Sequence, residues 1–467
     1  MKKIKNILLI LCFLSSLIAL YWVTGDRTPW NNLITDKSNN GISIYLGDIP
    51  NENYDRMGFA KGIVKYIESE DGWLVGNERG ELFLFSNNGD LQWKHSLGIG
   101  KLTSICISND SKIAFVGEQS QSGYMYAVNV SNGDILWKHA AIDFIGVDTT
   151  ARSYPSVVHI AVDDKDTVFA NIYRFSMGKD GTRNYYARMV AVDKYGDLLW
   201  KFPDNEVIDC WINWCDVNSY NGKVVISTSA YDFRKDMKYK DTIYLIEKDT
   251  GKLLNSVYIP PVEPFDNTVM RGSPNFSQDG KYLAACCSDG RAILMDHKGK
   301  ILWSRTLSKP TQVDGAWINA SGRDGYGLDN GVAFTTINTF NRENWQLPTP
   351  VEHPSNNSIF MFNYDGSYRY QYMADGTMEE LAFADGKIAC AIGRNVRTHN
   401  YQAHGALILS EETGEKLSFY HTEGPLQAIS ISNDGEKIAG IEVPAVTPDG
   451  KIIGMHRLHI WKYLEGD

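Results

Sequence analysis

Basic and aromatic residues gather in four stretches of this sequence, a pairing typical of surfaces that bind other molecules. The stretches read YRFSMGKDGTRNYY (173–186), AYDFRKDMKYKD (230–241), TFNRENWQLPTPVEHPSNN (339–357) and GRNVRTHNYQAHG (393–405). They hold ten Lys or Arg against six Asp or Glu, a balance of +4 on a chain whose formal net charge is −10. Arginine and aromatic side chains are enriched among the residues that dominate binding energy in protein interfaces.

The candidate partner-binding residues are therefore side chains of these stretches. They are Arg174, Arg183, Tyr186, Tyr231, Arg234, Arg342, Trp345, Arg394, Arg397, His399 and His404. Solvated surface loops have a similar composition, so the prediction concerns the stretches as a group more than any single side chain.

Metal and catalytic chemistry finds little support in the sequence. His353, His399 and His404 could bind a metal, but no set of cysteines or carboxylates nearby completes a site. The sequence contains no G-x-S-x-G nucleophile elbow, no P-loop and no H-E-x-x-H zinc motif. We therefore predict neither a metal site nor catalytic residues.

The cysteines are predicted to be free and mostly buried thiols. Cys210 and Cys215 lie in DCWINWCD, which reads as a strand. Five residues of strand span about 16 Å, which is beyond the reach of a disulfide. Cys286 and Cys287 are adjacent, and on a strand their side chains would point to opposite faces.

The N-terminus has the pattern of an export segment. Lys2, Lys3 and Lys5 precede an apolar run from Ile7 to Val23. The run is long for a cleaved signal and slightly short for a spanning helix, which needs roughly 20 apolar residues. Residues 1–25 are thus predicted to be a signal peptide or a membrane anchor, and the rest of the chain to be periplasmic or otherwise extracytoplasmic.

Composition favours one large β-structured body. Hydrophobic residues make up 43% of the chain and charged residues 22%, which is enough for a packed core. Aromatic residues reach 12%, with 25 Tyr and 12 Trp, and aromatic residues favour strands. The net charge of −10 argues against nucleic acid as a partner of the whole surface.

An internal repeat organises the chain. The repeating unit is a strand, a polar turn that contains glycine, and a second strand. It occurs in FLFSNNGDLQW, YAVNVSNGDILW, MVAVDKYGDLLW, YLIEKDTGKLLN, AILMDHKGKILW, FMFNYDGSYRYQ and LILSEETGEKLS. The marker residues of the repeat are Gly89, Trp93, Gly133, Trp137, Gly196, Trp200, Gly251, Gly299 and Trp303. Glycine allows the positive φ of a tight turn, and tryptophan is predicted to pack one sheet on the next.

A second hairpin precedes many of these repeats. It appears as ISNDSKIAFVG, VNSYNGKVVISTSA, FSQDGKYLAACC, FADGKIACAIG and ISNDGEKIAGIE. Each unit then has four antiparallel strands, A to D in chain order, and a period near 50 residues of this kind is the signature of a β-propeller. The fold class predicted is all-β.

The two ends of the chain are predicted to complete one unit together. After Leu426 the sequence supplies strands A, B and C, and it stops where strand D would begin. GISIYLGD, residues 41–48, is an alternating run without a partner of its own, and it would supply that outer strand and remove an open edge. This predicts eight blades, with seven as the alternative, in residues 58–467, and an N-terminal segment over 26–57 that includes the closing strand.

The repeat resembles that of pyrroloquinoline-quinone (PQQ)-type propellers. The resemblance rests on an apolar strand, D/N-x-x-x-G and L-x-W, and it extends over nearly all of the exported chain. That superfamily includes the eight-bladed quinoprotein alcohol dehydrogenases and a non-enzymatic outer-membrane-protein assembly lipoprotein, a periplasmic scaffold. The S-x-D-G-x-x-I/L-A hairpins also resemble those of WD40-like propellers. Turn and packing residues carry the resemblance, so it implies the fold far more than the function.

In such a propeller the A–B and C–D turns form one face, here called the turn face, and the B–C loops and D–A connections form the other, the loop-rich face. All four basic stretches fall on B–C loops. We therefore expect a non-enzymatic, membrane-associated scaffold that binds an envelope protein or peptide through the loop-rich face, without a cofactor.

The alternative is a PQQ-dependent quinoprotein-like oxidoreductase, which would use PQQ with calcium. Cys286 and Cys287 superficially match the adjacent-cysteine disulfide of those enzymes. Here the pair lies within an apparent B strand, in YLAACCSDG, rather than in an early loop over the axis. The family's acidic base and calcium ligands find no match in this sequence either.

Overall fold

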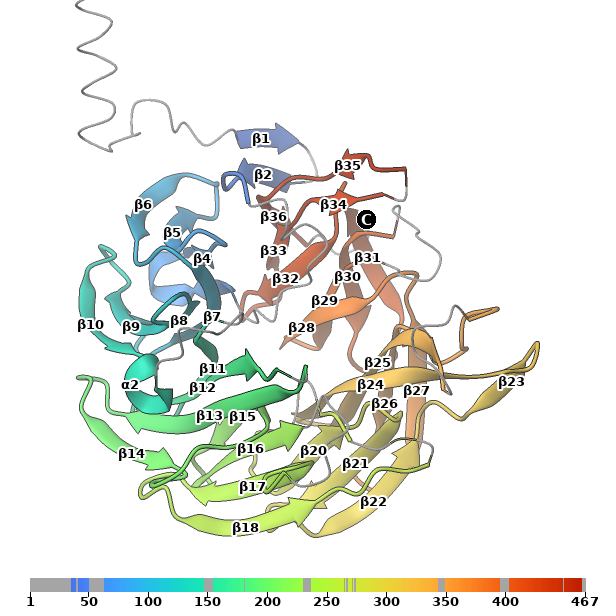
Figure 1. The fold of residues 1–467 in the computed structure, drawn as a ribbon. Coiled ribbons are helices and arrows are strands. Elements are labelled where there is room, and N and C mark those ends of the chain that lie inside the picture. The colour runs from blue at the N-terminus through green and yellow to red at the C-terminus, as the bar shows by residue number, and fades with distance from the viewer. Residues whose placement is uncertain are drawn as a thin grey trace, which may run out of the picture.

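Antiparallel strands make up nearly all of the regular secondary structure in the described chain (Figure 1). The computed structural model describes residues 35–38 (backbone alone), 41–49, 63–146, 154–179, 181–229, 237–263, 265, 268–270, 272, 274–342, 349–394, 403–447 and 449–463. Helical structure in these residues comprises α2 (Ile142–Ile145) and the 3-10 turn η2 (Glu68–Glu70). No helix in these ranges is long and apolar enough to cross a membrane, and the predicted export segment lies outside them.

The strands of the first half of the chain pair in groups of four consecutive strands, as the repeat predicts, and one bridge between Ser156 and Gln119 links the second group to the third. The first two groups are β3 (Val64–Ile67), β4 (Gly72–Gly76), β5 (Glu81–Ser86) and β6 (Leu91–Ser96), then β7 (Lys101–Ile107), β8 (Ile113–Gln119), β9 (Tyr124–Asn129) and β10 (Ile135–Ala140). The next two are β11 (Ser156–Val162), β12 (Val168–Met177), β13 (Arg183–Val192) and β14 (Leu198–Phe202), then β15 (Trp211–Asn218), β16 (Lys223–Ser229), β17 (Thr242–Glu247) and β18 (Leu253–Tyr258).

The second half continues the pattern with one elaboration. Two groups are regular: β19 (Asn275–Phe276), β20 (Tyr282–Cys286), β21 (Arg291–Asp296) and β22 (Ile301–Thr306), and β28 (Met378–Ala384), β29 (Lys387–Ile392), β30 (Gly405–Ser410) and β31 (Lys416–His421). The group between them is β24 (Ala316–Leu328), β25 (Gly331–Asn341), β26 (Ser358–Phe362) and β27 (Tyr368–Met373), and the short β23 (Thr311–Val313) pairs with the beginning of its long β24.

The last group joins both ends of the chain. β32 (Leu426–Ile431), β33 (Lys437–Glu442) and β36 (Arg457–Lys462) are strands A, B and C, and β2 (Gly41–Tyr45) pairs antiparallel with β36. The pairing predicted for GISIYLGD is therefore present. The sequence did not suggest two additions: β1 (Thr35–Ser38) pairs with β2, and β34 (Ala445–Val446) forms a small hairpin with β35 (Ile452–Ile453).

The repeat glycine and the repeat tryptophan meet across neighbouring groups. Gly196 has φ of +96°, and a Cβ there would lie 2.9 Å from the Trp137 ring of the preceding group. The indole Nε1–H of Trp137 donates to the carbonyl of Lys194, 2.9 Å away, in the same turn as Gly196. Glycine is needed here both for the turn and to make room for the ring.

This contact recurs around the molecule. The indole donations run from Trp93 to Val130, Trp137 to Lys194, Trp200 to Lys248 and Trp303 to Tyr364. Where the repeat lacks tryptophan another donor takes its place: the Asn255 amide bonds Lys298 O at 2.6 Å, and the Tyr370 hydroxyl bonds Glu411 O at 2.7 Å.

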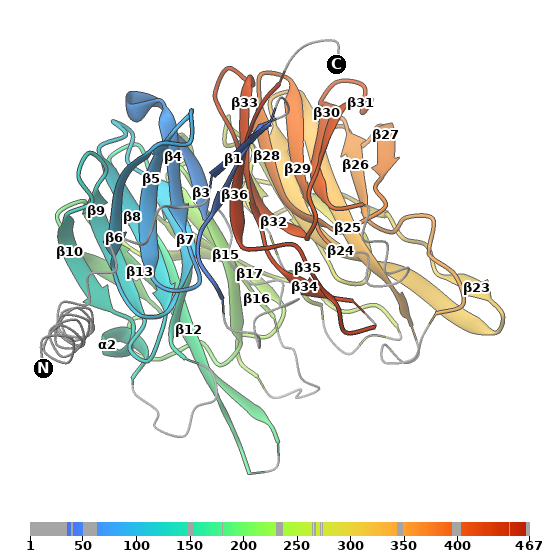
Figure 2. The ribbon, with the colours of Figure 1, turned by 90° about the horizontal axis from the view of Figure 1, so that it is seen from above.

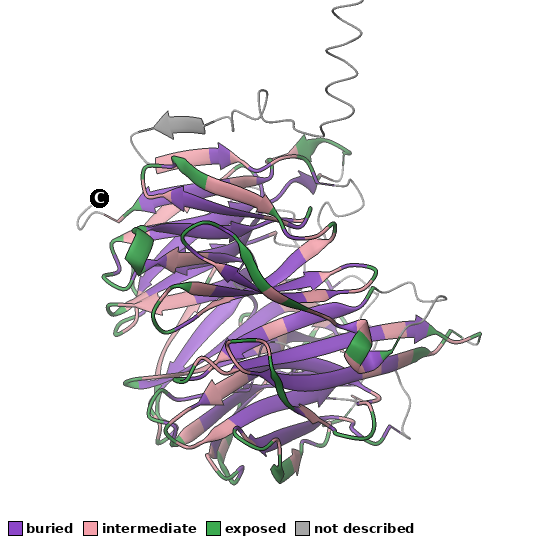
Figure 3. Cartoon of the chain, turned by 90° about the vertical axis from the view of Figure 1, so that its left-hand side faces the viewer, coloured by how far each residue is buried: buried purple, intermediate pink, exposed green. Residues whose placement is uncertain are grey.

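The core consists of apolar clusters between successive groups rather than one central mass. Each of eight clusters combines buried residues of two neighbouring groups, and one combines the last group with the first. Figure 3 shows the resulting pattern of buried strand interiors and exposed turns and outer strands. Cys286 and Cys287 belong to different clusters, on opposite sides of their group, as strand geometry predicts. All six described cysteines are free, and five of them are buried.

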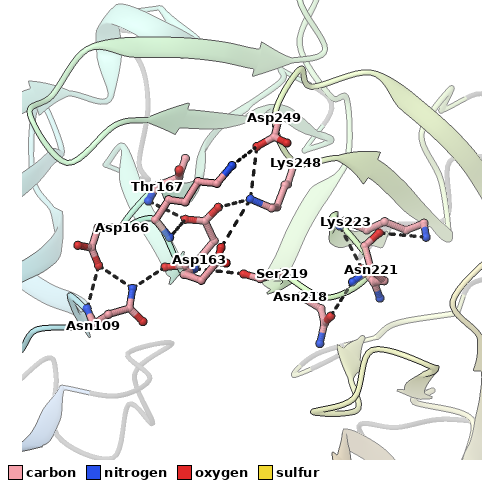
Figure 4. A network of polar contacts seen from close by, with 12 residues as sticks. Asn109, Asp163, Asp166, Thr167, Asn218, Ser219, Asn221, Lys223, Lys248 and Asp249 are labelled. Carbon is pink, nitrogen blue, oxygen red and sulfur yellow. Dashed lines mark hydrogen bonds and ion pairs between the residues drawn. The ribbon is translucent and has the colours of Figure 1, made fainter.

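Polar contacts join neighbouring groups on the turn face (Figure 4). The Asn109 amide donates to Asp163 O and to the Asp166 carboxylate, and the Asp164 N–H donates to Ser219 Oγ. Lys248 Nζ lies 2.6 Å from the Asp163 carboxylate, and both side chains are buried. Burial alone would lower the pKa of Lys248, but Asp163 and Asp249 outweigh it and raise that pKa. These contacts hold the short turns in fixed positions.

Candidate partner-binding face

Three extensions project from the groups on the loop-rich face. They are the β12–β13 hairpin, the β24–β25 pair with β23, and the β34–β35 hairpin, and Figure 2 shows the β12 and β23 extensions on the same side of the molecule. The stretch 173–186 is therefore mostly strand, and the loop predicted there is wrong. Its alternation of bulky side chains continues the two long strands beyond the body of their group.

Arg174 lies on β12 and serves internal contacts. Its guanidinium is buried 3.9 Å from the ring centre of Tyr186, its cross-strand partner on β13. Its Nε donates to Gly146 O at 2.9 Å and its Nη2 to Ile145 O at 3.3 Å, at the C-terminal end of α2. Positive charge is favourable at that end of a helical turn. Arg174 and Tyr186 thus hold the connection before β11 in place.

Arg188 holds the same connection from β13. Its side chain donates to Phe144 O at 3.1 Å and to Glu206 O, so it joins the connections on both sides of its group. Burial lowers the pKa of this arginine, and Asp204 and Tyr239 oppose that effect. Arg188 was not among the predicted residues, because its position inside a regular strand carries no sequence signal of contact with loops.

Arg183 and Arg342 are closer to the surface. Arg183 is exposed at the start of β13, and its guanidinium lies 5.5 Å from the centre of the Phe175 ring. Arg342 follows β25, lies 5.2 Å from the ring centre of Phe265 and donates to Glu263 O. Two of the predicted arginines thus present a basic and aromatic surface on this face.

The two described candidate histidines are buried. His353 Nε2 lies 2.8 Å from Lys309 O, and the Ser355 N–H donates to its Nδ1 at 3.0 Å, so backbone contacts occupy both ring nitrogens. Burial lowers the pKa of His353 below its ordinary value, against the effect of the Lys309 carbonyl. His404 is fully buried, with Nδ1 3.4 Å from Glu423 O. The described residues contain no group of His, Cys, Asp or Glu that could hold a metal ion.

Arg394 is half-buried at the end of its described segment, where Thr377 Oγ1 donates to its carbonyl at 3.0 Å. The remaining predicted residues lie outside the described residues: Tyr231, Arg234, Trp345, Arg397 and His399. Of the four stretches, the structure therefore places Arg174 and Arg183 together on the β12–β13 hairpin, and Arg342 separately at the end of β25.

Exposed apolar side chains indicate an interaction site on the loop-rich face more clearly than its charged side chains do. Apart from the outer D strands, the exposed large hydrophobic residues of the described chain on this face are Ile99, Tyr154, Met177, Val262, Trp317, Val351, Val446, Ile452 and Met455. The turn face carries Tyr195 and Tyr220. Exposed apolar side chains gathered on one face are typical of interaction sites. Sequence reasoning missed this feature, because apolar residues in irregular segments look the same whether buried or exposed.

A buried charged cluster lies where β24, β28 and the connection before β19 meet. Arg323 Nη1 lies 3.0 Å from Glu379 and donates to Met378 O, and Arg323 Nε lies 3.6 Å from Asp324. Burial alone would lower the pKa of Arg323. The negative charges of Glu379 and Asp324 have the larger effect, so the pKa of Arg323 is raised. Gly272 N donates to Arg323 O, and a Cβ on Gly272 would collide with the Asp324 carboxylate. The cluster ties three segments together.

A second polar cluster joins the chain ends. Ser43 Oγ on β2 lies 2.8 Å from His459 Nδ1 on β36, and His459 Nε2 lies 2.6 Å from the buried Glu442 carboxylate. The Gly424 N–H donates to Glu442 Oε1 at 2.7 Å. This order of serine, imidazole and carboxylate also occurs in nucleophilic catalysis. Here the three groups lie on the strands that join N- and C-terminus, and we assign them to that junction.

The comparisons with known proteins concern the fold. No family model and no curated protein matches the sequence. The crystal structure of BamB from Moraxella catarrhalis is similar to this chain, with a TM-score of 0.54 and 13% sequence identity, over 92% of this chain and 100% of that one. At this identity the likeness shows the fold alone, which is a β-propeller.

Proposed function

We propose that this chain is an exported, membrane-associated and non-enzymatic scaffold of the cell envelope, which binds a protein or peptide through its loop-rich face. The observation that carries the proposal is the gathering of exposed apolar side chains on that face, with Arg183 and Arg342 beside them. Nucleic acid is not proposed as a partner, and neither is a cofactor or a metal.

The proposal includes an eight-bladed propeller closed by β2. The pairing of β2 with β36 supports it, and so does the apolar cluster between the last and the first group. Eight such clusters, each between successive groups, favour eight blades over the alternative of seven. The likeness to BamB supports the fold, and the repeat's resemblance to the superfamily of the assembly lipoprotein motivates the envelope setting.

The test is capture of partners from envelope extracts by the full chain. We expect Arg183→Glu combined with Trp317→Ser to lose most of the captured protein, because an interface loses affinity when an arginine and an aromatic residue are removed together. Tyr220→Ser is the matched control, since Tyr220 is an exposed aromatic residue on the turn face. Equal loss of captured protein from both variants, or loss from neither, would contradict the proposal.

A second pair of changes, Arg394→Glu with Arg397→Glu, should weaken the capture of partner proteins without unfolding the chain.

The quinoprotein-like alternative is tested separately. Its sequence argument was the adjacent cysteines, and Cys286 and Cys287 now lie in different apolar clusters. Addition of PQQ and calcium should produce neither a cofactor absorbance band nor dye reduction with alcohols or sugars. A clear positive in both assays would replace the scaffold by an oxidoreductase.

A further inference from the structure

The β34–β35 hairpin and Met455, which follows it, expose apolar side chains on the loop-rich face, and Arg457 Nη2 lies 3.2 Å from the Met455 sulfur. Val446 and Ile452 are cross-strand partners, so their side chains lie on the same side of the hairpin, and they are 37% and 53% exposed. Met455, just after the hairpin, is 48% exposed. The turn of the hairpin carries Asp449 and Lys451, whose opposite charges leave no net charge on it.

The base of the hairpin is firmly held. Gly454 has φ of +70°, and a Cβ there would lie 2.5 Å from Gly424 and 2.6 Å from the Glu442 carboxylate. The Met455 N–H lies 3.3 Å from the same carboxylate, and Glu442 also binds His459. The exposed patch therefore sits on an anchored base.

The first described residues of the chain lie near the base of this hairpin. Thr35, the first residue of β1, pairs with Ile44, and the next residue Tyr45 pairs with Arg457, where β36 begins after the hairpin. Leu46 N also donates to His456 O at 2.9 Å. The register thus places the start of β1 at the loop-rich end of the last group.

The tether between the predicted anchor and β1 is short. The apolar run ends at Val23, and residues 24–34 separate it from β1. Eleven residues span at most about 40 Å when fully extended. A bilayer that holds the anchor therefore stays within reach of the hairpin, whatever protein partner is present.

We propose that the β34–β35 hairpin, with Val446, Ile452 and Met455, rests on the lipid bilayer and turns the loop-rich face toward the membrane. The inference rests on one part of the proposed function, the membrane association. It assigns Val446, Ile452 and Met455 to lipid and leaves the other exposed apolar side chains of the loop-rich face to the protein partner. Apolar side chains on a hairpin without net charge fit the acyl boundary of a bilayer better than its charged headgroup surface. The hairpin thus binds a lipid surface, and the N-terminal anchor of the same chain keeps that surface close to it.

The test uses the full chain reconstituted in vesicles of phosphatidylcholine with phosphatidylglycerol, without any other protein. The photo-crosslinking residue p-benzoylphenylalanine is placed at Ile452, or at Tyr220 as the matched control. Tyr220 is 85% exposed on the turn face. After illumination, mass spectrometry should find lipid adducts at position 452 and none above background at position 220.

A second variant separates contact from mere proximity. With the crosslinker at Val446, the changes Ile452→Asp and Met455→Asp should abolish the lipid adduct, because two charges would have to leave water. Circular dichroism should show the same unfolding transition as for the unchanged chain. Four outcomes would each overturn the proposal. They are equal lipid adducts at positions 452 and 220, no adduct at position 452, a lipid adduct that persists in the Asp variant, and loss of the chain from the vesicles. Partner capture plays no part in this assay, so its failure remains distinguishable from that of the scaffold function.

Discussion

At the residue scale, the repeat tryptophans do two things at once. Trp137 packs against the neighbouring turn glycine, and its indole N–H satisfies a carbonyl in the same turn. The two exposed residues before it, such as Leu136, sit at a bulge in the C–D pairing and contribute little packing. A bulge of this kind also blunts the open edge of an outer strand.

We expect Trp137→Ala to lower the free energy of unfolding by about 2–3 kcal/mol, less than the roughly 3–5 kcal/mol for a fully buried aromatic residue, because Trp137 is half-buried. Trp137→Phe keeps most of the packing and should lose about 1 kcal/mol with its hydrogen bond. Urea unfolding followed by circular dichroism measures both. Leu136→Ala is the control, and a loss as large as that of Trp137→Ala would refute the role assigned to the indole.

The buried imidazole of His353 should make stability depend on pH. Its pKa is lower in the folded chain than in the unfolded one, so the unfolded state binds more protons in the acid range. Stability should be complete above the ordinary histidine pKa of about 6.5 and fall as pH decreases through it. His353→Gln should flatten this dependence in melting curves, and an unchanged slope would show that His353 does not contribute.

At the element scale, the junction of β2 with β36 depends on a buried polar group. Glu442 is fully buried and holds His459, Gly424 and the root of the β34–β35 hairpin. The sequence predicted the strand pair from its alternation, but it gave no sign of the carboxylate behind it.

Glu442→Ala should destabilise the chain by about 1–3 kcal/mol or more, since it leaves buried polar groups, the Gly424 N–H among them, without their hydrogen-bond partner. Hydrogen exchange should then become faster first in β2 and β36. Glu436→Ala, at an exposed position of the same group, should change neither quantity. Faster exchange spread evenly over all groups would contradict a local junction.

At the scale of the whole molecule, stability comes from packing between groups. The six described cysteines are free and belong to strands and their ends rather than to cross-links. A reducing agent should therefore leave the melting temperature unchanged, whereas loss of a native disulfide typically costs about 2–5 kcal/mol. A clear decrease in melting temperature under reduction would reveal a disulfide and reopen the quinoprotein-like alternative.

The sequence by itself determined most of the strands, the turns and the grouping in fours, because alternation and turn glycines act over a few residues. It also indicated the partner of GISIYLGD, since an outer strand was missing elsewhere. It missed β1, the β34–β35 hairpin and the extension of β12 and β13. The tertiary structure alone decided which arginines remain accessible. Arg174 and Arg183 lie nine residues apart with similar neighbours, yet one is enclosed by α2 and the other is exposed. Burial depends on which distant segment packs on a side chain, and local sequence does not encode that.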